Sequence, residues 1–214
     1  NKYFLFLEKP IANNDTELKN ISKILQKSKN KVIVNYFRSW DKNNLNFINK
    51  IKKRNCNEVI ANYSNSLESN ASHIIYMLIE IFGKKFNIQI LDKEKKCPTF
   101  IMFFEPNVKV ILNGIRNTKN NFCEISFITE NEVLSFESAG CRYVSQKFNK
   151  NIFYKNYYQL GPKKNIFKEQ ELNVFGNISK IINQNIRYNL KKNFSNFSRS
   201  VEVTKVLNYI KSRL

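Results

Sequence analysis

The chain has 214 residues, of which 42% are hydrophobic and 14% aromatic, which is enough for a folded core. Its formal net charge is +19, but the basic residues are scattered in short runs among many asparagines, so we expect solvated basic faces and no nucleic-acid partner. No apolar run approaches membrane-spanning length, so no membrane partner is expected. The cysteines form no close pair, which predicts free thiols and a cytoplasmic protein; they are Cys56, Cys97, Cys123 and Cys141.

The first 36 residues alternate between strand and helix signals. The apolar run Tyr3–Leu7 predicts a strand that is buried on both faces. A helix follows, with Asn13 or Asn14 as its cap and a stripe of apolar residues at Leu18, Ile21 and Leu25. The run Val32–Val34 predicts a second buried strand, which completes one parallel crossover. One crossover is too small for a domain, so we expect it to be the tail of a larger one.

Beyond Arg38 the pattern is that of a second α/β unit. It predicts a helix near Asn43–Arg54, a strand at Glu58–Tyr63 and an apolar helix from about Asn70 to Phe82, ended by Gly83. Closely spaced strand signals then predict a mostly antiparallel sheet, with strands at Thr99–Phe104, Val108–Ile115, Cys123–Ile128, Val133–Phe136 and Cys141–Ser145. Two further helices are expected at Glu171–Leu190 and from a cap near Ser200.

Three motifs carry a resemblance to a known family. The first is Leu7-Glu8-Lys9-Pro10-Ile11-Ala12, which ends the first strand. The second runs from Asn62-Tyr63-Ser64-Asn65-Ser66-Leu67 through Asn70-Ala71-Ser72-His73-Ile74-Ile75 to Ile81-Phe82-Gly83. The third lies between Pro98 and Leu112-Asn113-Gly114. In order and spacing they resemble the Gfo/Idh/MocA oxidoreductases, and the resemblance covers nearly the whole chain.

The resemblance implies an α/β (α+β) fold in two parts. Residues 1–36 would be the C-terminal remnant of a Rossmann dinucleotide-binding domain. Residues 37–214 would form a substrate-binding and oligomerisation domain with an open, mostly antiparallel sheet, its last helix, at about 200–213, packing back on the first part. The implied function is hydride transfer between NAD or NADP and a carbinol or carbonyl carbon of a sugar or nucleotide sugar. Apolar residues on both sides of the strands at 100–104 and 108–112 predict a homo-oligomer through the open sheet face.

Such chemistry needs a base for the hydroxyl proton and a positive charge near the developing carbonyl oxygen. His73 is the only histidine, and a place at a helix start would keep its ring neutral and ready to accept a proton. Lys9 ends a buried strand, at the edge where parallel sheets place their ligands. We therefore expect Lys9 and His73 to be catalytic, with no metal. The resemblance also implies cofactor contacts at Glu8, Lys9 and Pro10 and candidate substrate contacts at Arg38, Trp40, Asn70 and Tyr76.

Two positions depart from the family pattern. Many members have an acidic residue four positions before the histidine, where this chain has Ser69, and another three positions after it, where it has Tyr76. Glu68 or Asn70 could orient the ring instead. The departures leave open an alternative, a catalytically inactive binding or scaffold protein of the same fold.

A glycine-rich turn of the Gly-x-Gly-x-x-Gly type is absent, and the sequence has only 5 glycines. In the family this phosphate-binding turn lies upstream of the Glu-Lys-Pro strand, so we expect the chain to be a fragment of a longer reading frame. The 214 residues alone should then bind neither NAD nor NADP measurably, since the turn anchors the pyrophosphate. Calorimetric titration tests this, and a dissociation constant in the micromolar range would contradict it.

Overall fold

The computed structural model describes residues 4–27, 31–167, 176, 179, 180, 183 and 196–214. Helices and strands follow one another in the order β1 (Phe4–Leu7), α1 (Asp15–Lys27), β2 (Lys31–Val34), α2 (Lys42–Lys52), β3 (Cys56–Tyr63), α3 (Ser72–Phe82), β4 (Phe86–Ile90), β5 (Phe100–Phe104), β6 (Val108–Gly114), β7 (Cys123–Thr129), β8 (Glu132–Glu137), β9 (Arg142–Lys150), β10 (Tyr158–Leu160), β11 (Lys164–Asn165) and α5 (Phe197–Lys211). Shorter helical turns are η1 (Phe37–Trp40), η2 (Leu67–Ala71) and η3 (Ser138–Gly140).

The N-terminal part is a parallel two-stranded unit, with β1 and β2 in a register that pairs Leu7 with Val34. Between the strands, α1 begins with a capping box. The Asn14 Oδ1 accepts from the Glu17 amide at 2.9 Å, and the Glu17 carboxylate accepts from the Asn13 amide at 3.0 Å. Leu18 on the inner side of the helix is buried. The unit thereby brings the end of β1, and Lys9 after it, to one edge of the parallel pair.

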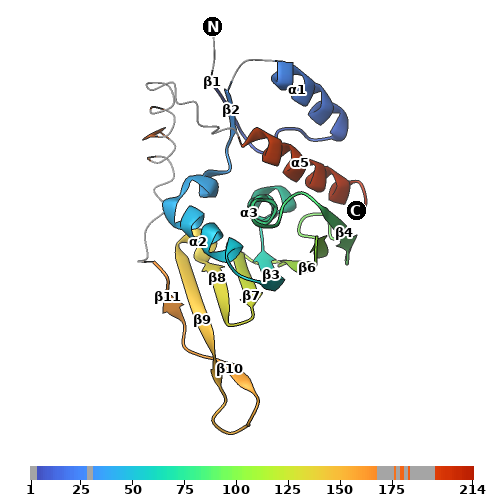
Figure 1. Ribbon diagram of the computed structural model, residues 1–214. Helices are drawn as coiled ribbons and strands as arrows, with labels where there is room; N and C mark the ends of the chain where they lie inside the picture. The colour runs from blue at the N-terminus through green and yellow to red at the C-terminus, as the bar shows by residue number, and fades with distance from the viewer. Residues whose placement is uncertain (1–3, 28–30, 168–175, 177–178, 181–182, 184–195) are drawn as a thin grey trace.

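A nine-stranded sheet forms the second part, in the order β10-β9-β8-β7-β3-β6-β5-β4, with β11 beside β9. All its pairs are antiparallel except β3 with β6. Both α2 and α3 lie over one face (Figure 1), where alternate strand residues such as Val59, Phe100 and Leu112 are fully buried. The predicted fold class, with its large, mostly antiparallel sheet, is therefore confirmed.

The C-terminal helix α5 joins the two parts, since it packs on α3, α1 and β2 (Figure 1). Just before α5, the Asn196 side chain makes two hydrogen bonds to the backbone of Val34 at the end of β2. It accepts from the Val34 amide and donates to the Val34 carbonyl, both at 2.8 Å. The helix begins at Phe197, so the predicted cap at Ser200 is wrong. Ser200 lies one turn inside, and its hydroxyl donates to the Asn196 carbonyl at 2.8 Å.

The first strand is not buried on both faces as predicted, because Phe6 of β1 is 39% exposed; the other predicted elements differ mainly in their bounds. The strand expected to end at Ser145 continues as β9 to Lys150 and carries a hairpin with β10 that extends away from the helices (Figure 1). The predicted helix at Glu171–Leu190 lies, apart from four positions, outside the described residues. Among the helices that are described, none is long and apolar enough to span a membrane.

Candidate active site

Lys9 connects the two parts of the fold. Its ammonium donates to two backbone carbonyls of the second part, those of Glu68 at 2.6 Å and Ser69 at 2.8 Å. An ammonium has three N–H donors, so these contacts leave one for a ligand. Lys9 is therefore fixed in position and still able to bind a substrate oxygen.

The two carbonyls are available because the chain enters α3 through a π-helix, η2. The Ser66 hydroxyl caps this segment by accepting from the Ser69 amide at 2.9 Å. The Ser72 hydroxyl donates to the same carbonyls of Glu68 and Ser69, at 2.6 and 3.1 Å. Single π-turns are frequent at functional sites, and here the turn forms the binding site of the Lys9 ammonium.

His73 lies beside this contact and is 7% exposed. Its ring packs against Phe37 at 4.8 Å and against the edge of Tyr36 at 5.6 Å, measured between ring centroids. Burial holds the pKa of His73 well below the ordinary value for histidine, and the charges of Arg38 and Lys9 lower it further. The ring is therefore neutral, as the sequence predicted, but for a different reason. The helix dipole acts on the first turn of a helix. The helical segment begins at Leu67, so His73 lies beyond that turn.

Lys9 is itself affected by this environment. Its pKa is lowered to about 8, chiefly by burial and also by the charge of Arg38, although Glu8, Cys123 and Glu68 oppose the shift. An ammonium with such a pKa is charged below about pH 8 and becomes a proton donor near it. The pair of neutral imidazole and ammonium has the protonation states that carbinol oxidation requires.

Arg38 completes the cluster from η1. The residue is 8% exposed, and its guanidinium lies 4.6 Å from the centroid of the Phe37 ring, the same ring that His73 contacts. Its Nε donates to the Ala139 carbonyl at 3.0 Å. The fold thus brings together three predicted site residues, Lys9, Arg38 and His73.

The two side chains that could orient the His73 ring are engaged elsewhere. The Glu68 carboxylate pairs with Lys211 of α5 at 2.6 Å, which lowers the pKa of Glu68 although burial opposes ionisation. The Asn70 amide nitrogen donates to the Asn121 side chain at 2.6 Å and to the carbonyls of Phe122 and Ser64. Asn70 therefore binds the loop before β7 rather than the imidazole. No hydrogen bond within the described part of the chain reaches the His73 ring.

Tyr76 replaces the second acidic residue of the family pattern with a packed aromatic ring. It stacks on Tyr36 at 4.3 Å, and its hydroxyl accepts from Arg199 of α5 at 2.8 Å. Arg199 also pairs with Glu80, one helical turn after Tyr76, at 2.7 Å. The arrangement joins α3 to α5. Sequence reasoning missed Arg199, because nothing in the local pattern links it to Tyr76, 123 residues away.

The remaining predicted residues lie around the end of β1. The Glu8 carboxylate accepts from the Asn35 side chain at 2.9 Å, and the Lys9–Pro10 peptide is cis. Trp40 packs its edge against Phe6, with centroids 6.4 Å apart. This edge of a parallel pair, with one N–H of Lys9 left over, fits the nicotinamide end of a dinucleotide. No group of three or more His, Cys, Asp or Glu residues that could hold a metal occurs among the described residues.

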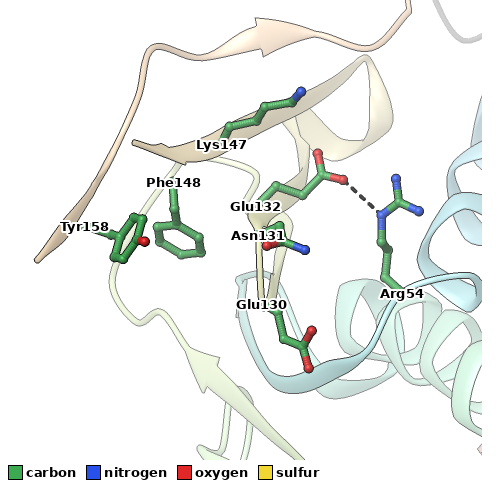
Figure 2. Close-up of a pocket in the computed structure, with 7 residues that line it drawn as sticks. All are labelled: Arg54, Glu130, Asn131, Glu132, Lys147, Phe148 and Tyr158. Atoms are coloured by element: carbon green, nitrogen blue, oxygen red, sulfur yellow. Dashed lines mark hydrogen bonds and ion pairs between the residues drawn. The ribbon is translucent and has the colours of Figure 1, made fainter. Parts of the chain in front are cut away.

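A large hollow of the described surface lies elsewhere, beside β8 and β9, with a volume of about 900 Å³. Figure 2 shows its lining, in which Glu132 faces Arg54. The Glu132 carboxylate accepts from the Arg54 Nε at 3.1 Å and from the Ser145 hydroxyl at 2.5 Å. These contacts satisfy the carboxylate. Burial raises the pKa of Glu132, but the hydrogen bonds and the nearby positive charges outweigh it and lower the pKa. The charged groups of this hollow neutralise one another, and it has no neutral imidazole like that of His73.

Comparison with solved structures identifies the class of fold. Over 98% of this chain and 70% of the other, it superposes with a TM-score of 0.75 on the UDP-N-acetylglucosamine 3-dehydrogenase GnnA from Acidithiobacillus ferrooxidans, at 8% identity. It is similar to the dehydrogenase MviM from Clostridium difficile, with a TM-score of 0.70 and 12% identity over 98% and 71% of the two chains. It is also similar to a variant of the 3-ketoreductase KijD10 from Actinomadura kijaniata, in complex with TDP-benzene and NADP. The TM-score is 0.68 at 8% identity, over 97% of this chain and 68% of the other.

The chain thus has the fold of the Gfo/Idh/MocA-type oxidoreductases, as the resemblance of its motifs predicted. Identities this low establish the fold alone. No protein-family model matches the sequence, and no curated protein sequence does.

The cluster predicts the protonation state of His73. In the full-length protein its ring should stay neutral at pH 6.5, the ordinary midpoint of a histidine. Lys9→Met should raise the pKa of His73, because it removes one of the positive charges that disfavour imidazolium. Nitrogen-15 NMR of labelled histidine measures the protonation state of His73 at pH 6.5 and its pKa in the Lys9 variant. The signal of His73 is assigned with the His73→Gln variant. Lys85→Met is the control, because the Lys85 side chain is 82% exposed just before β4. An unchanged His73 pKa in the Lys9 variant would contradict the arrangement.

Proposed function

We propose that the protein is a nicotinamide-dependent oxidoreductase that acts on a sugar or nucleotide sugar in the cytoplasm. One observation carries the proposal: the Lys9 ammonium, held by two carbonyls of η2, lies in one buried cluster with the neutral imidazole of His73. The solved structures with the same fold support the reaction class and the substrate class, since they include a UDP-sugar dehydrogenase and a 3-ketoreductase bound to NADP.

In the oxidative direction, the neutral His73 ring accepts the proton of the substrate hydroxyl. Lys9 donates its remaining N–H to the same oxygen and stabilises the negative charge that develops there. NAD or NADP, when bound, supplies the acceptor of the hydride. In the reductive direction the proton returns from His73 to the carbonyl oxygen. Glu8, Lys9 and Pro10 would line the nicotinamide end, and Arg38 and Trp40 the substrate side.

The first test is removal of the base. In the full-length protein, His73→Ala should lower turnover by roughly two to four orders of magnitude while cofactor affinity stays nearly unchanged, because a positioned proton acceptor contributes on that scale. Turnover is followed by the absorbance of reduced nicotinamide and normalised to folded protein. Lys9→Met should weaken both turnover and formation of the ternary complex, since its charge serves substrate and nicotinamide together.

The inactive scaffold remains the alternative, and the same variants distinguish it. Ser69 and Tyr76 stand in place of carboxylates, and no described side chain orients His73, which is what such a protein would also show. A structural histidine would lower the melting temperature but leave activity per folded molecule largely intact. If more than about a tenth of turnover survives in His73→Ala, the catalytic assignment is wrong.

We also propose that the protein is a homo-oligomer that assembles through the outer face of the sheet. Both α2 and α3 lie on the other face (Figure 1). On the outer face Ile60 and Phe103 are 42% and 41% exposed, beside Ile111 on the strand between them. Apolar side chains in the middle of a sheet face gain free energy when a second copy covers them.

Charges introduced on this face should dissociate the oligomer. The double variant Ile60→Glu, Phe103→Glu buries two carboxylates in the proposed interface and should reduce the mass in light scattering to that of a monomer. Ile24→Glu is the matched control, because Ile24 is an apolar residue on α1 that is 65% exposed. A monomeric mass for the unmodified full-length protein would refute the assembly.

A further inference from the structure

Arg38 is a buried cation without a counter-charge. The residue is 8% exposed, yet none of the ion pairs among the described residues includes it. Its one hydrogen bond there uses the Nε, which leaves both terminal nitrogens of the guanidinium without a described partner, and neither is fully enclosed, so a ligand can reach them. Burying a charge is costly unless an opposite charge compensates it.

The backbone around Arg38 holds the guanidinium in one orientation. The carbonyl that accepts from its Nε belongs to Ala139, in the short turn η3. Ser138 and Ala139 both have positive φ angles, 51° and 53°, which cost about 1 kcal/mol each for residues other than glycine. Such conformations persist where the surroundings enforce them, and they cluster at functional sites. With the Nε fixed, the two terminal nitrogens form a rigid fork.

Lys9 adds a second positive charge to the same place. Arg38 is close enough to lower the pKa of both Lys9 and His73. The two acidic residues whose charges act on Lys9 have other partners, since Glu8 accepts from Asn35 and Glu68 pairs with Lys211. Two cations therefore surround the neutral imidazole, in a region where the low dielectric strengthens every charge interaction.

We propose that the substrate carries an oxyanion, a carboxylate or a phosphate, on the sugar unit that exchanges the hydride, and that the fork of Arg38 binds this group. Planar guanidinium matches either oxyanion through two parallel N–H bonds. This inference rests on the proposed function and narrows its substrate class from sugars in general to acidic ones.

Binding of an oxyanion would also improve His73 as a base. In the absence of ligand, two cations disfavour imidazolium, and a base with a very low pKa accepts a proton poorly. An anion on Arg38 cancels part of that field, so the pKa of His73 should rise when the acidic substrate binds. Neutral sugars lack this effect. Selectivity for acidic substrates would thus arise in the chemical step as well as in binding.

The test uses two matched pairs of probes on the full-length protein, followed through the NMR signal of His73. UDP-glucuronate and UDP-glucose differ by one carboxylate, and D-glucose 6-phosphate and D-glucose differ by one phosphate. In at least one pair, the probe with the additional oxyanion on its sugar unit should bind about ten-fold or more tightly than its partner, the scale of a charge-assisted hydrogen bond, and should raise the pKa of His73 more than the partner does. The pair that shows the preference identifies the oxyanion.

Arg38→Gln should abolish that preference, whereas Arg213→Gln, which removes the same charge from an exposed position, should retain it. The melting temperature gives a second reading that does not depend on binding. If the only role of Arg38 is to support η3, the melting temperature of Arg38→Gln will be lower than that of the unmodified protein. If Arg38 is an unpaired buried charge kept for a ligand, the melting temperature will stay the same or rise.

Equal binding of the two probes within both pairs, or no response of His73 to any probe, overturns the inference. Its failure is distinct from failure of the proposed function. Oxidation of reduced nicotinamide with a neutral sugar would leave that function standing, while Arg38 would have no acidic ligand. If no nicotinamide turnover is found but an acidic probe is clearly preferred, the oxyanion site is supported and the proposed enzymatic function is wrong.

Discussion

The hydrogen bonds from the Lys9 ammonium to the carbonyls of Glu68 and Ser69 hold the site together. They are the polar link between the end of the parallel pair β1–β2 and the start of α3. Because η2 is a π-helix, it turns these carbonyls towards Lys9, and Ser72 shares them. α5 also joins the two parts, but this link is what holds the cation after β1 beside the start of α3, the helix that carries the base. The position of α5 supports the same junction, since Asn196 pairs with Val34 and Lys211 with Glu68.

The electrostatics of the cluster depend on the absence of an unpaired carboxylate from its described part. Carboxylates lie near it, but each has a partner of its own, Glu68 on Lys211 and Glu80 on Arg199. The positions of Ser69 and Tyr76, acidic in many proteins with the resembling motifs, hold a hydroxyl and an aromatic ring. The result is a site with a neutral base, a lysine with a lowered pKa and a fixed guanidinium. A field of this sign favours anions over neutral ligands.

Local sequence signals were sufficient for much of the fold, and three of the residues predicted for the site, Lys9, Arg38 and His73, lie together in it. Runs such as Val32–Val34 and the stripe at Leu18 reflect burial that the final structure reproduces. The signals failed where the deciding contact is distant in sequence. Ser200 has the chemistry of a cap, but Asn196 comes first and is held by Val34, 162 residues away. The π-turn, the pairing of Glu68 with Lys211 and the Arg199 contact to Tyr76 are likewise tertiary, and no local pattern encodes them.

The reason for the neutral state of His73 shows how a correct expectation can rest on the wrong cause. A helix dipole would act on the first turn, and the π-helix shifts that turn to Leu67, away from the imidazole. Burial acts instead, together with two cations, and only the contribution of the cations can be cancelled by a ligand. A dipole is a fixed property of the backbone, whereas the charges of Lys9 and Arg38 can be neutralised by what binds there. With the proposed oxyanion bound, the basicity of His73 would be set jointly by the protein and its ligand. The absence of carboxylates at Ser69 and Tyr76, which an inactive protein would also show, leaves the positive charges of Lys9 and Arg38 available to such an anion.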